Sequence, residues 1–303
     1  MLRMKRIVVA CDLEGAGVGP TAALAIEQAR AIAARSGAHV TLFHSRRGGE
    51  HWSASANEYE SLADRDTSEA KRILEAAAGP LRSAGIACDA VVSDGPAGHA
   101  LVQQVLREHA DLVVLGKRER VPRDGRRMGS VSLNVVRHAP CLVSVLQPEA
   151  KPLPGLIVAA TDGGPVGARV VRVAASLAAI CGGTLHVIHA LSIDLETQLQ
   201  GAEEEQVYVE RRCRELRAEV DAQAKEGGYE GRVQLHAGVT TPTRAVREAV
   251  SRLQPDAVVM GTISRGGVPG LLVGNTAERL LGTLDCSLIV AKPDDFVSPV
   301  TLD

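Results

Sequence analysis

Residues 258–278 read VVMGTISRGGVPGLLVGNTAE, and this stretch predicts the kind of fold the chain adopts. It begins with a short apolar run that ends at Gly261, as expected of a buried strand. Five glycines lie between positions 261 and 274, and Asn275 then stands three positions before Glu278, a pattern typical of a helix N-terminus. Such a strand, loop and helix present backbone N–H groups and a positive dipole end to an anion. Any strand-to-helix connection in an α/β protein can look similar, so one copy does not identify a site.

The chain carries this layout twice. The first copy is the apolar run 112–116, followed by a loop that ends at Gly129 and Ser130. Thirteen positions separate Gly116 from Gly129, and thirteen separate Gly261 from Gly274. The two copies lie 145 positions apart. This spacing predicts a duplicated module.

Length and composition limit the class of protein. A chain of 303 residues suits two domains better than one core. The 34 basic and 36 acidic residues leave a net charge of −2, which gives no general attraction to nucleic acid or to an anionic membrane. Aromatic residues are 2% of the chain, too few for base-stacking platforms. We therefore expect no nucleic-acid partner.

The six cysteines form no Cys-x-x-Cys pair, so neither a zinc site nor a thioredoxin-type motif is expected. Cys141 and Cys286 share the 145-residue spacing, and each opens an apolar run, as a small buried side chain would. The apolar run after residue 6 is too short for a signal peptide, and no stretch has the length of a membrane span. These features predict a cytoplasmic protein with no metal site and no membrane insertion.

Apolar runs alternate with helical patterns along the whole chain. Strands are expected at 7–11, 39–44, 87–92, 112–116 and 141–146, and again at 156–161, 184–189, 233–237, 258–261 and 286–291. Helices are expected at 20–35, about 64–84, around 101–106 and from 130, then up to about 181, at 203–225, around 245–253 and from 275, with irregular structure at 45–61. This alternation predicts two tandem doubly wound parallel-sheet α/β domains. We place them at 1–147 and 155–303, joined by a proline-rich linker at 148–154.

Asp12 and Asp162 each end the first strand of their copy. In open parallel sheets, ligands bind at the carboxyl ends of strands near the topological switch point. An aspartate there can accept hydrogen bonds from a ribose or a base amine, or it can cap the turn that follows. Both explanations remain open. His44 and His189 end the second strands, 145 residues apart, and the sequence assigns them no chemical role.

Known nucleotide motifs are absent from the sequence. There is no P-loop motif, and the run GAGVG at 15–19 has its third glycine one place early for a dinucleotide fingerprint. Strand two also ends in His44 where such a fold needs an acidic residue, so a nicotinamide dehydrogenase is rejected.

The first loop carries six cations between Lys117 and Arg127, which could clamp phosphates or form a solvated basic loop, whereas the second has only Arg265.

These residues resemble the universal stress protein family. The likeness covers two tandem copies, each with an aspartate after strand one and a loop that resembles the family's form Gly-x2-Gly-x9-Gly-Ser/Thr/Asn. The stretch from Gly261 to Asp294 resembles the tandem E-type members most. The resemblance implies two five-stranded domains of the adenine nucleotide alpha hydrolase-like type, with strand order 3-2-1-4-5. It also implies bound ATP or another adenine nucleotide, with Mg²⁺ able to accompany it. The residues carried over are Asp12, Gly116, Gly129 and Ser130 in the first copy, and Asp162, Gly261, Ser264, Gly266, Gly274 and Asn275 in the second.

The chain departs from the family motif at the middle glycine of each loop. Glu119 replaces it in the first copy, and a carboxylate there repels phosphate unless an arginine neutralises it. Ser264 replaces it in the second copy, a milder change that the pair Gly266 and Gly267 could offset. The second copy is therefore the better nucleotide candidate.

The leading functional prediction is a non-catalytic stress-response protein that binds an adenine nucleotide or another small ligand. An interaction scaffold without a small ligand is the second hypothesis, and a slow ATPase or nucleotide hydrolase is the third. The sequence shows no metal-ligand cluster and no nucleophile–base pair. In the family the last strands commonly form dimers, so intramolecular domain pairing, or a homodimer, is expected.

Overall fold

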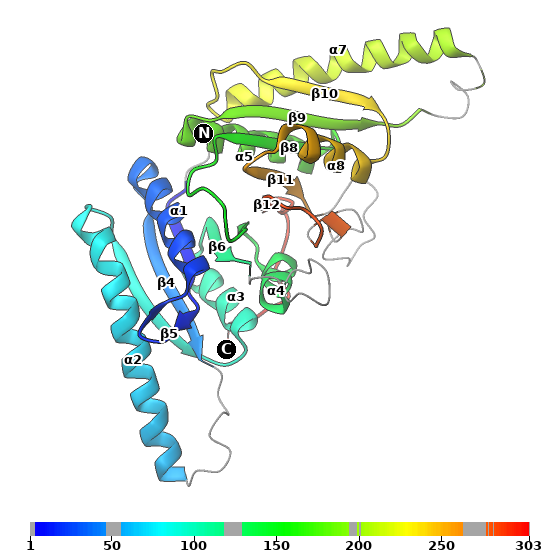
Figure 1. Ribbon diagram of the computed structural model, residues 1–303. Helices are drawn as coiled ribbons and strands as arrows, with labels where there is room; N and C mark the ends of the chain where they lie inside the picture. The colour runs from blue at the N-terminus through cyan, green and yellow to red at the C-terminus, as the bar shows by residue number, and fades with distance from the viewer. Residues whose placement is uncertain are drawn as a thin grey trace. The chain divides into compact units, whose positions relative to one another are not determined.

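A computed structural model describes residues 4–46, 56–117, 129–193, 199, 201–262, 277, 279–280 and 282–302, with side chains described from residue 66 onward in the second of these ranges (Figure 1). The chain divides into two compact units. The N-terminal unit consists of residues 3–153 together with 297–303, and the C-terminal unit is built on Pro154–Phe296. The last residues join the N-terminal unit through contacts such as the 3.1 Å hydrogen bond from Gln103 Nε2 to the Thr301 carbonyl oxygen.

The N-terminal unit has a five-stranded parallel sheet. Its strands are β1 (Arg6–Ala10), β4 (His39–Arg46), β5 (Cys88–Asp94), β6 (Leu112–Gly116) and β7 (Leu142–Leu146). They lie in the order β7-β6-β1-β4-β5, which confirms the predicted order 3-2-1-4-5. The helices are α1 (Pro20–Ser36), α2 (Ala56–Ser83), α3 (Ala97–Glu108) and α4 (Ser130–His138).

The C-terminal unit repeats this sheet. Its strands are β8 (Leu156–Thr161), β9 (Thr184–Leu191), β10 (Gln234–Val239), β11 (Ala257–Gly261) and β12 (Ser287–Ala291). Their order is β10-β9-β8-β11-β12, again 3-2-1-4-5 and all parallel. The helices are α5 (Pro165–Cys181), α7 (Ala202–Glu226) and α8 (Pro242–Leu253). Two tandem parallel-sheet α/β domains are therefore confirmed.

The first crossover helix of each unit begins and ends as the sequence indicates. Pro20 and Pro165 occupy the first turns of α1 and α5, where a missing N–H costs nothing. Each helix ends at a glycine with left-handed backbone, Gly37 at φ 69° and Gly182 at φ 67°. Because the two prolines are 145 residues apart, the helices occupy equivalent places in the repeat.

The connection before this helix differs between the units. Asp12 stands eight positions before Pro20, whereas Asp162 stands three before Pro165. The longer connection contains a small antiparallel hairpin of β2 (Leu13–Glu14) and β3 (Gly17–Val18), turning at Gly15 with φ 57°. Of the three glycines that resemble a dinucleotide fingerprint, Gly15 and Gly17 therefore belong to a hairpin, and Gly19 is the N-cap residue of α1.

The cores are aliphatic, as the low aromatic content requires. The central strands are almost fully buried, and Cys11, Cys88, Cys141 and Cys286 are buried free thiols within this packing. Helix α2 begins at Ala56, inside the stretch expected to be irregular, and β4, β5, β9 and β10 each extend two residues further than predicted. In the described part of the chain no helix is long and apolar enough to cross a membrane.

Candidate functional site

The strand order brings the first and fourth strands of each unit together. In the N-terminal unit β1 pairs with β6, and in the C-terminal unit β8 pairs with β11. Because all these strands are parallel, their carboxyl ends meet at one edge, where the crossovers leave in opposite directions. Asp12 and Gly116 lie at this switch point in one unit, and Asp162 and Gly261 lie there in the other.

Asp12 lies at the start of α1. Its carbonyl oxygen accepts a 2.9 Å hydrogen bond from the N–H of Gly19, the N-cap residue of α1. A Cβ atom added to Gly19 would lie 2.9 Å from Asp12 Oδ2, so the carboxylate packs directly on this glycine. A side chain at position 19 would therefore displace the Asp12 carboxylate, which lies next to the positive end of the helix dipole.

Asp162 caps the turn that leads into the equivalent helix. Its Oδ1 accepts a 2.9 Å hydrogen bond from the N–H of Gly164, the N-cap residue of α5. A Cβ atom at Gly167 would lie 2.5 Å from the same oxygen. The capping role that the sequence left open is therefore present at Asp162. A cap through one carboxylate oxygen does not by itself prevent the residue from contacting a ligand.

His44 and His189, which the sequence left without a role, make the same bond in both units. Nδ1 of His44 lies 2.8 Å from the carbonyl oxygen of Cys11, and Nδ1 of His189 lies 2.9 Å from that of Thr161. Each acceptor precedes the aspartate of its unit. Since a carbonyl can only accept, Nδ1 of each histidine carries a proton and donates this hydrogen bond, and Nε2 takes no part in it. The shared 145-residue spacing was the sequence signal for this pair.

The two described glycines of the first loop have different surroundings. A Cβ atom at Gly116 would overlap with Cβ of Thr21 in the first turn of α1, so packing alone requires glycine there. Gly129 is the N-cap residue of α4, with φ −62° and ψ 154°, and a Cβ atom there would meet nothing within 4 Å. Neither backbone strain nor packing among the described residues requires glycine at 129. Ser130 is the first residue of α4.

In the C-terminal unit the described site ends just after β11. Gly261 is the last residue of β11, and Thr262 follows with its N–H bonded to the Ala291 carbonyl oxygen at 3.1 Å. Thr262 is 1% exposed, and its Oγ1 has no hydrogen-bond partner among the described residues. Glu119 and the predicted residues Ser264, Gly266, Gly274 and Asn275 lie outside the described residues.

Neither a metal site nor a reactive thiol is found among the described residues near these strand ends. Among the described residues no group of three or more His, Cys, Asp or Glu side chains could hold a metal ion. The pKa of the Cys11 thiol, next to Asp12, is raised far above its ordinary value, first by burial and then by the neighbouring carboxylate. This thiol is therefore neutral and unsuited to nucleophilic chemistry.

Comparison with known proteins identifies a family and a shared fold. The sequence model of the universal stress protein family matches residues 4–147 and 156–292. Universal stress protein E of Escherichia coli K12 is 40% identical over 62 residues, which are 20% of this chain and 20% of that protein. The chain therefore aligns with only about a fifth of the length of its enterobacterial relatives.

Two further comparisons extend over more of the chain. A universal stress protein of Mycobacterium tuberculosis is 28% identical over 194 residues, which are 62% of this chain and 63% of that protein. The crystal structure of a universal stress protein from Archaeoglobus fulgidus aligns with a TM-score of 0.68 at 18% identity, covering 96% of this chain and 100% of that one. This structural alignment shows a shared fold along nearly the whole chain.

Proposed function

Because the chain belongs to the universal stress protein family and carries two copies of its domain in tandem, we propose that it binds an adenine nucleotide or another small ligand. In this proposal the protein is non-catalytic, acts in the stress response and works in the cytoplasm. The C-terminal unit is its main binding site. A bound ligand would then report or modulate a cellular state through this unit.

One observation carries the proposal: each unit places an aspartate and a glycine together where its first and fourth strands end. The pairing of β1 with β6, and of β8 with β11, puts Asp12 near Gly116 and Asp162 near Gly261. This is the place where open parallel sheets bind nucleotides, with a carboxylate for a nucleoside and backbone amides for phosphates.

Two further features support a ligand at these places. Gly129 has no steric or torsional need to be glycine, and a phosphate that approaches the backbone at the start of α4 would supply one. The hydroxyl of Thr262, beside Gly261, is buried without a partner among the described residues. Buried hydroxyls normally have a hydrogen-bond partner, so a ligand or a water molecule would lower the free energy there.

The ranking of the two units rests on the loops. Glu119 would place a carboxylate beside phosphate in the N-terminal unit, while Ser264 adds only a hydroxyl in the C-terminal unit. We therefore expect Gly274→Val to weaken nucleotide binding more than Gly129→Val does. Calorimetric titration of both variants tests this ranking, and equal losses of affinity would contradict it.

Native mass spectrometry of the purified full chain tests the function itself, because it reports a retained ligand and the assembly together. Thermal unfolding with ATP, ADP and AMP follows, since a ligand at about one hundred times its Kd adds about 2.7 kcal/mol of stability. A flat response to all three nucleotides would favour a ligand-free scaffold. Nucleotide turnover that Asp162→Ala abolishes would instead identify a slow hydrolase.

A further inference from the structure

The outer edges of the two sheets are protected to different extents. In the N-terminal unit β5 is the edge strand, and two cationic side chains of α2 bond its carbonyl oxygens. Arg82 Nε donates to Cys88 and Lys71 Nζ donates to Ala90, both at 2.8 Å. Cationic side chains placed along an edge are a common way to prevent another strand from pairing there. The edge of β5 is therefore blocked.

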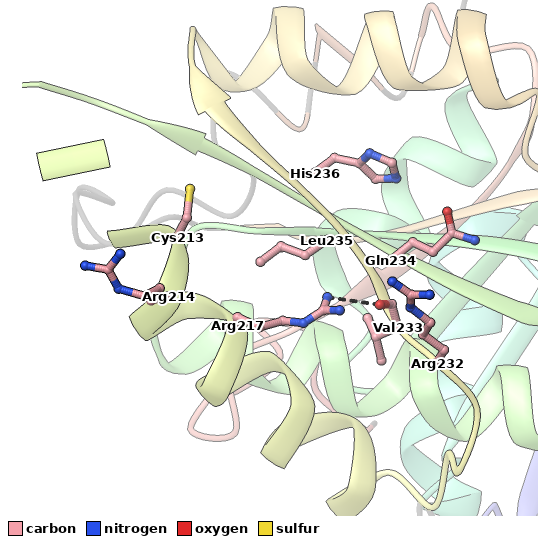
Figure 2. Close-up of a pocket in the computed structure, with 8 residues that line it drawn as sticks. All are labelled: Cys213, Arg214, Arg217, Arg232, Val233, Gln234, Leu235 and His236. Atoms are coloured by element: carbon pink, nitrogen blue, oxygen red, sulfur yellow. Dashed lines mark hydrogen bonds between the residues drawn. The ribbon is translucent and has the colours of Figure 1, made fainter. Parts of the chain in front are cut away.

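The equivalent edge in the C-terminal unit is β10, and only one of these bonds recurs. Arg217 Nη1 of α7 donates to the carbonyl oxygen of Val233 at 2.9 Å, drawn as a dashed line in Figure 2. Val233 corresponds to Cys88 by the 145-residue repeat. The position that corresponds to Lys71 is Leu216, which is buried and cannot donate. The carbonyl of Leu235, which corresponds to that of Ala90, therefore lacks this cap.

The direction of the backbone shows which groups face the open edge. The N–H of Thr240 donates to the carbonyl oxygen of Leu191 at the end of β9. Because successive residues of a strand bond to opposite sides, the even-numbered residues of β10 face β9. Leu235 and Ala237 therefore direct their N–H and C=O groups to the open edge. An extended segment could pair with these groups.

Helix α7 leaves this strand only partly covered, although Figure 1 shows the two lying side by side. Of its 25 residues only Leu216, Val220 and Ala224 are buried, all in the second half of the helix. A cavity of about 550 Å³ opens between the helix and the strand, lined by Cys213, Arg214, Arg217 and residues 232–236. Val239, at the end of β10, is 50% exposed. The groove thus offers apolar contact beside a free strand edge.

The charge of the groove is basic. Arg214 and Arg232 are exposed, and within the described ranges neither has an ion-pair partner (Figure 2). Arg217, the third arginine that lines the groove, forms an ion pair with Asp221, with 3.3 Å between Nε and Oδ2. Helix α7 also carries Glu210, Glu215 and Glu219, but Glu215 pairs with Arg211 and Arg212, and none of these three carboxylates lines the groove. The residues that line the groove include three arginines and no acidic residue.

We propose that β10 binds an extended acidic segment of a partner protein by strand addition. The segment pairs with the backbone of Leu235 and Ala237, packs apolar side chains beside α7, and places carboxylates near Arg214 and Arg232. Strand addition of this kind draws affinity from backbone hydrogen bonds and specificity from alternate side chains. A second copy of the chain fits the charge poorly, because residues 232–239 contain an arginine and no acidic residue. This inference does not depend on nucleotide binding.

A labelled hexapeptide of alternating glutamate and valine is the probe, titrated against the full chain by fluorescence anisotropy. We expect saturable binding that weakens with salt, and no binding of the matching lysine–valine peptide. Arg232→Glu should weaken binding roughly tenfold, because it reverses a charge at the groove. Arg107→Glu is the matched control, since Arg107 is an exposed arginine on α3 of the other unit, and it should leave binding unchanged.

Hydrogen exchange separates strand addition from simple charge attraction. Bound peptide should slow exchange at the amides of Leu235 and Ala237. Every second residue of the peptide directs its N–H group toward β10. N-methylation of that set of residues should abolish binding, and N-methylation of the other set should not. Binding without slower exchange at these amides would overturn the proposal. An equal loss of affinity in Arg107→Glu would do so too, as would self-association through β10 in sedimentation without peptide.

Discussion

Nδ1 of His186 lies 3.0 Å from Nε2 of His236, and the two rings stack with centroids 5.2 Å apart. These residues stand on neighbouring strands, β9 and β10. Arg252 of α8 adds a contact of 3.1 Å from Nη2 to His236 Nδ1. Because a guanidinium can only donate, His236 accepts at Nδ1 and donates from Nε2 to His186. The arrangement requires both imidazoles to be neutral.

This pair makes the C-terminal unit sensitive to acid. The pKa of each histidine is lowered, first by burial and then by the charge of Arg252. A lowered pKa means that the unfolded chain binds protons more readily, so the stabilisation is complete above the unfolded pKa of about 6.5 and is lost as the pH falls below it. We expect a lower melting temperature at about pH 5.5 than at about pH 7.5. His236→Gln should reduce that difference, as measured by circular dichroism.

His99→Gln is the control for this experiment, because His99 is an exposed histidine on α3. It should leave the pH dependence as it is in the unaltered chain. If His236→Gln and His99→Gln give the same difference between the two pH values, the histidine pair is not the source of the acid sensitivity.

Gly116 and Gly129 should respond differently to a side chain. A Cβ atom at Gly116 overlaps with Thr21, so Gly116→Ala should destabilise the protein by about 1–3 kcal/mol. Gly129→Ser has open space, an ordinary φ and a favoured N-cap residue, so its stability should change by less than about 0.5 kcal/mol. Urea unfolding of both variants measures this. A loss of stability in Gly129→Ser as large as in Gly116→Ala would contradict it.

The sequence predicted the architecture because a fully buried parallel strand needs a continuous apolar run, and the 145-residue repeat doubled that signal. It missed the β2–β3 hairpin, whose two-residue strands carry no periodicity. It also missed the early start of α2 at Ala56, although Ser55 and Glu58 have the spacing of a capping box.

The candidate site could be predicted only as residue types at strand ends. That Asp162 bonds the Gly164 N–H, and that His44 and His189 bond the preceding strand, depends on positions that only the folded chain defines. The loss of an edge cap at Leu216 likewise appears only when the neighbouring strand is in place, because nothing in the sequence shows which carbonyl Lys71 reaches.

A second pair of aspartates, Asp111 and Asp256, ties the first strand of each unit to the fourth. Asp111 Oδ2 accepts from the N–H groups of Lys5 and Arg6 at 2.7 and 3.0 Å, and Asp256 Oδ2 accepts from Gly155 and Leu156 at 2.8 and 2.9 Å. Hydrogen bonds to a charged group contribute about 1.5–3 kcal/mol. Asp111→Ala and Asp256→Ala should each lower the free energy of unfolding by about that amount.

The asparagine variants at these two positions are the comparison, since an amide oxygen still accepts from both N–H groups. They should retain more stability than the alanine variants in denaturant unfolding. Equal stability of the alanine variants and the unaltered chain would show that these bonds contribute nothing net.

Asp162→Asn separates the capping role of this residue from its proposed contact with a ligand. Asparagine still offers Oδ1 to the Gly164 N–H, so the change in stability should be limited to about 0.3–1 kcal/mol, from the lost charge at the start of α5. A ligand that donates to the carboxylate loses a charged acceptor, so nucleotide affinity should fall roughly tenfold or more. Calorimetric titration and thermal unfolding of the same preparation measure both. Asp12→Asn, at the end of β1, is the matched variant and should lower affinity less, because we expect Glu119 to weaken nucleotide binding in that unit. Unchanged nucleotide affinity in Asp162→Asn would show that Asp162 serves only to cap the turn before α5.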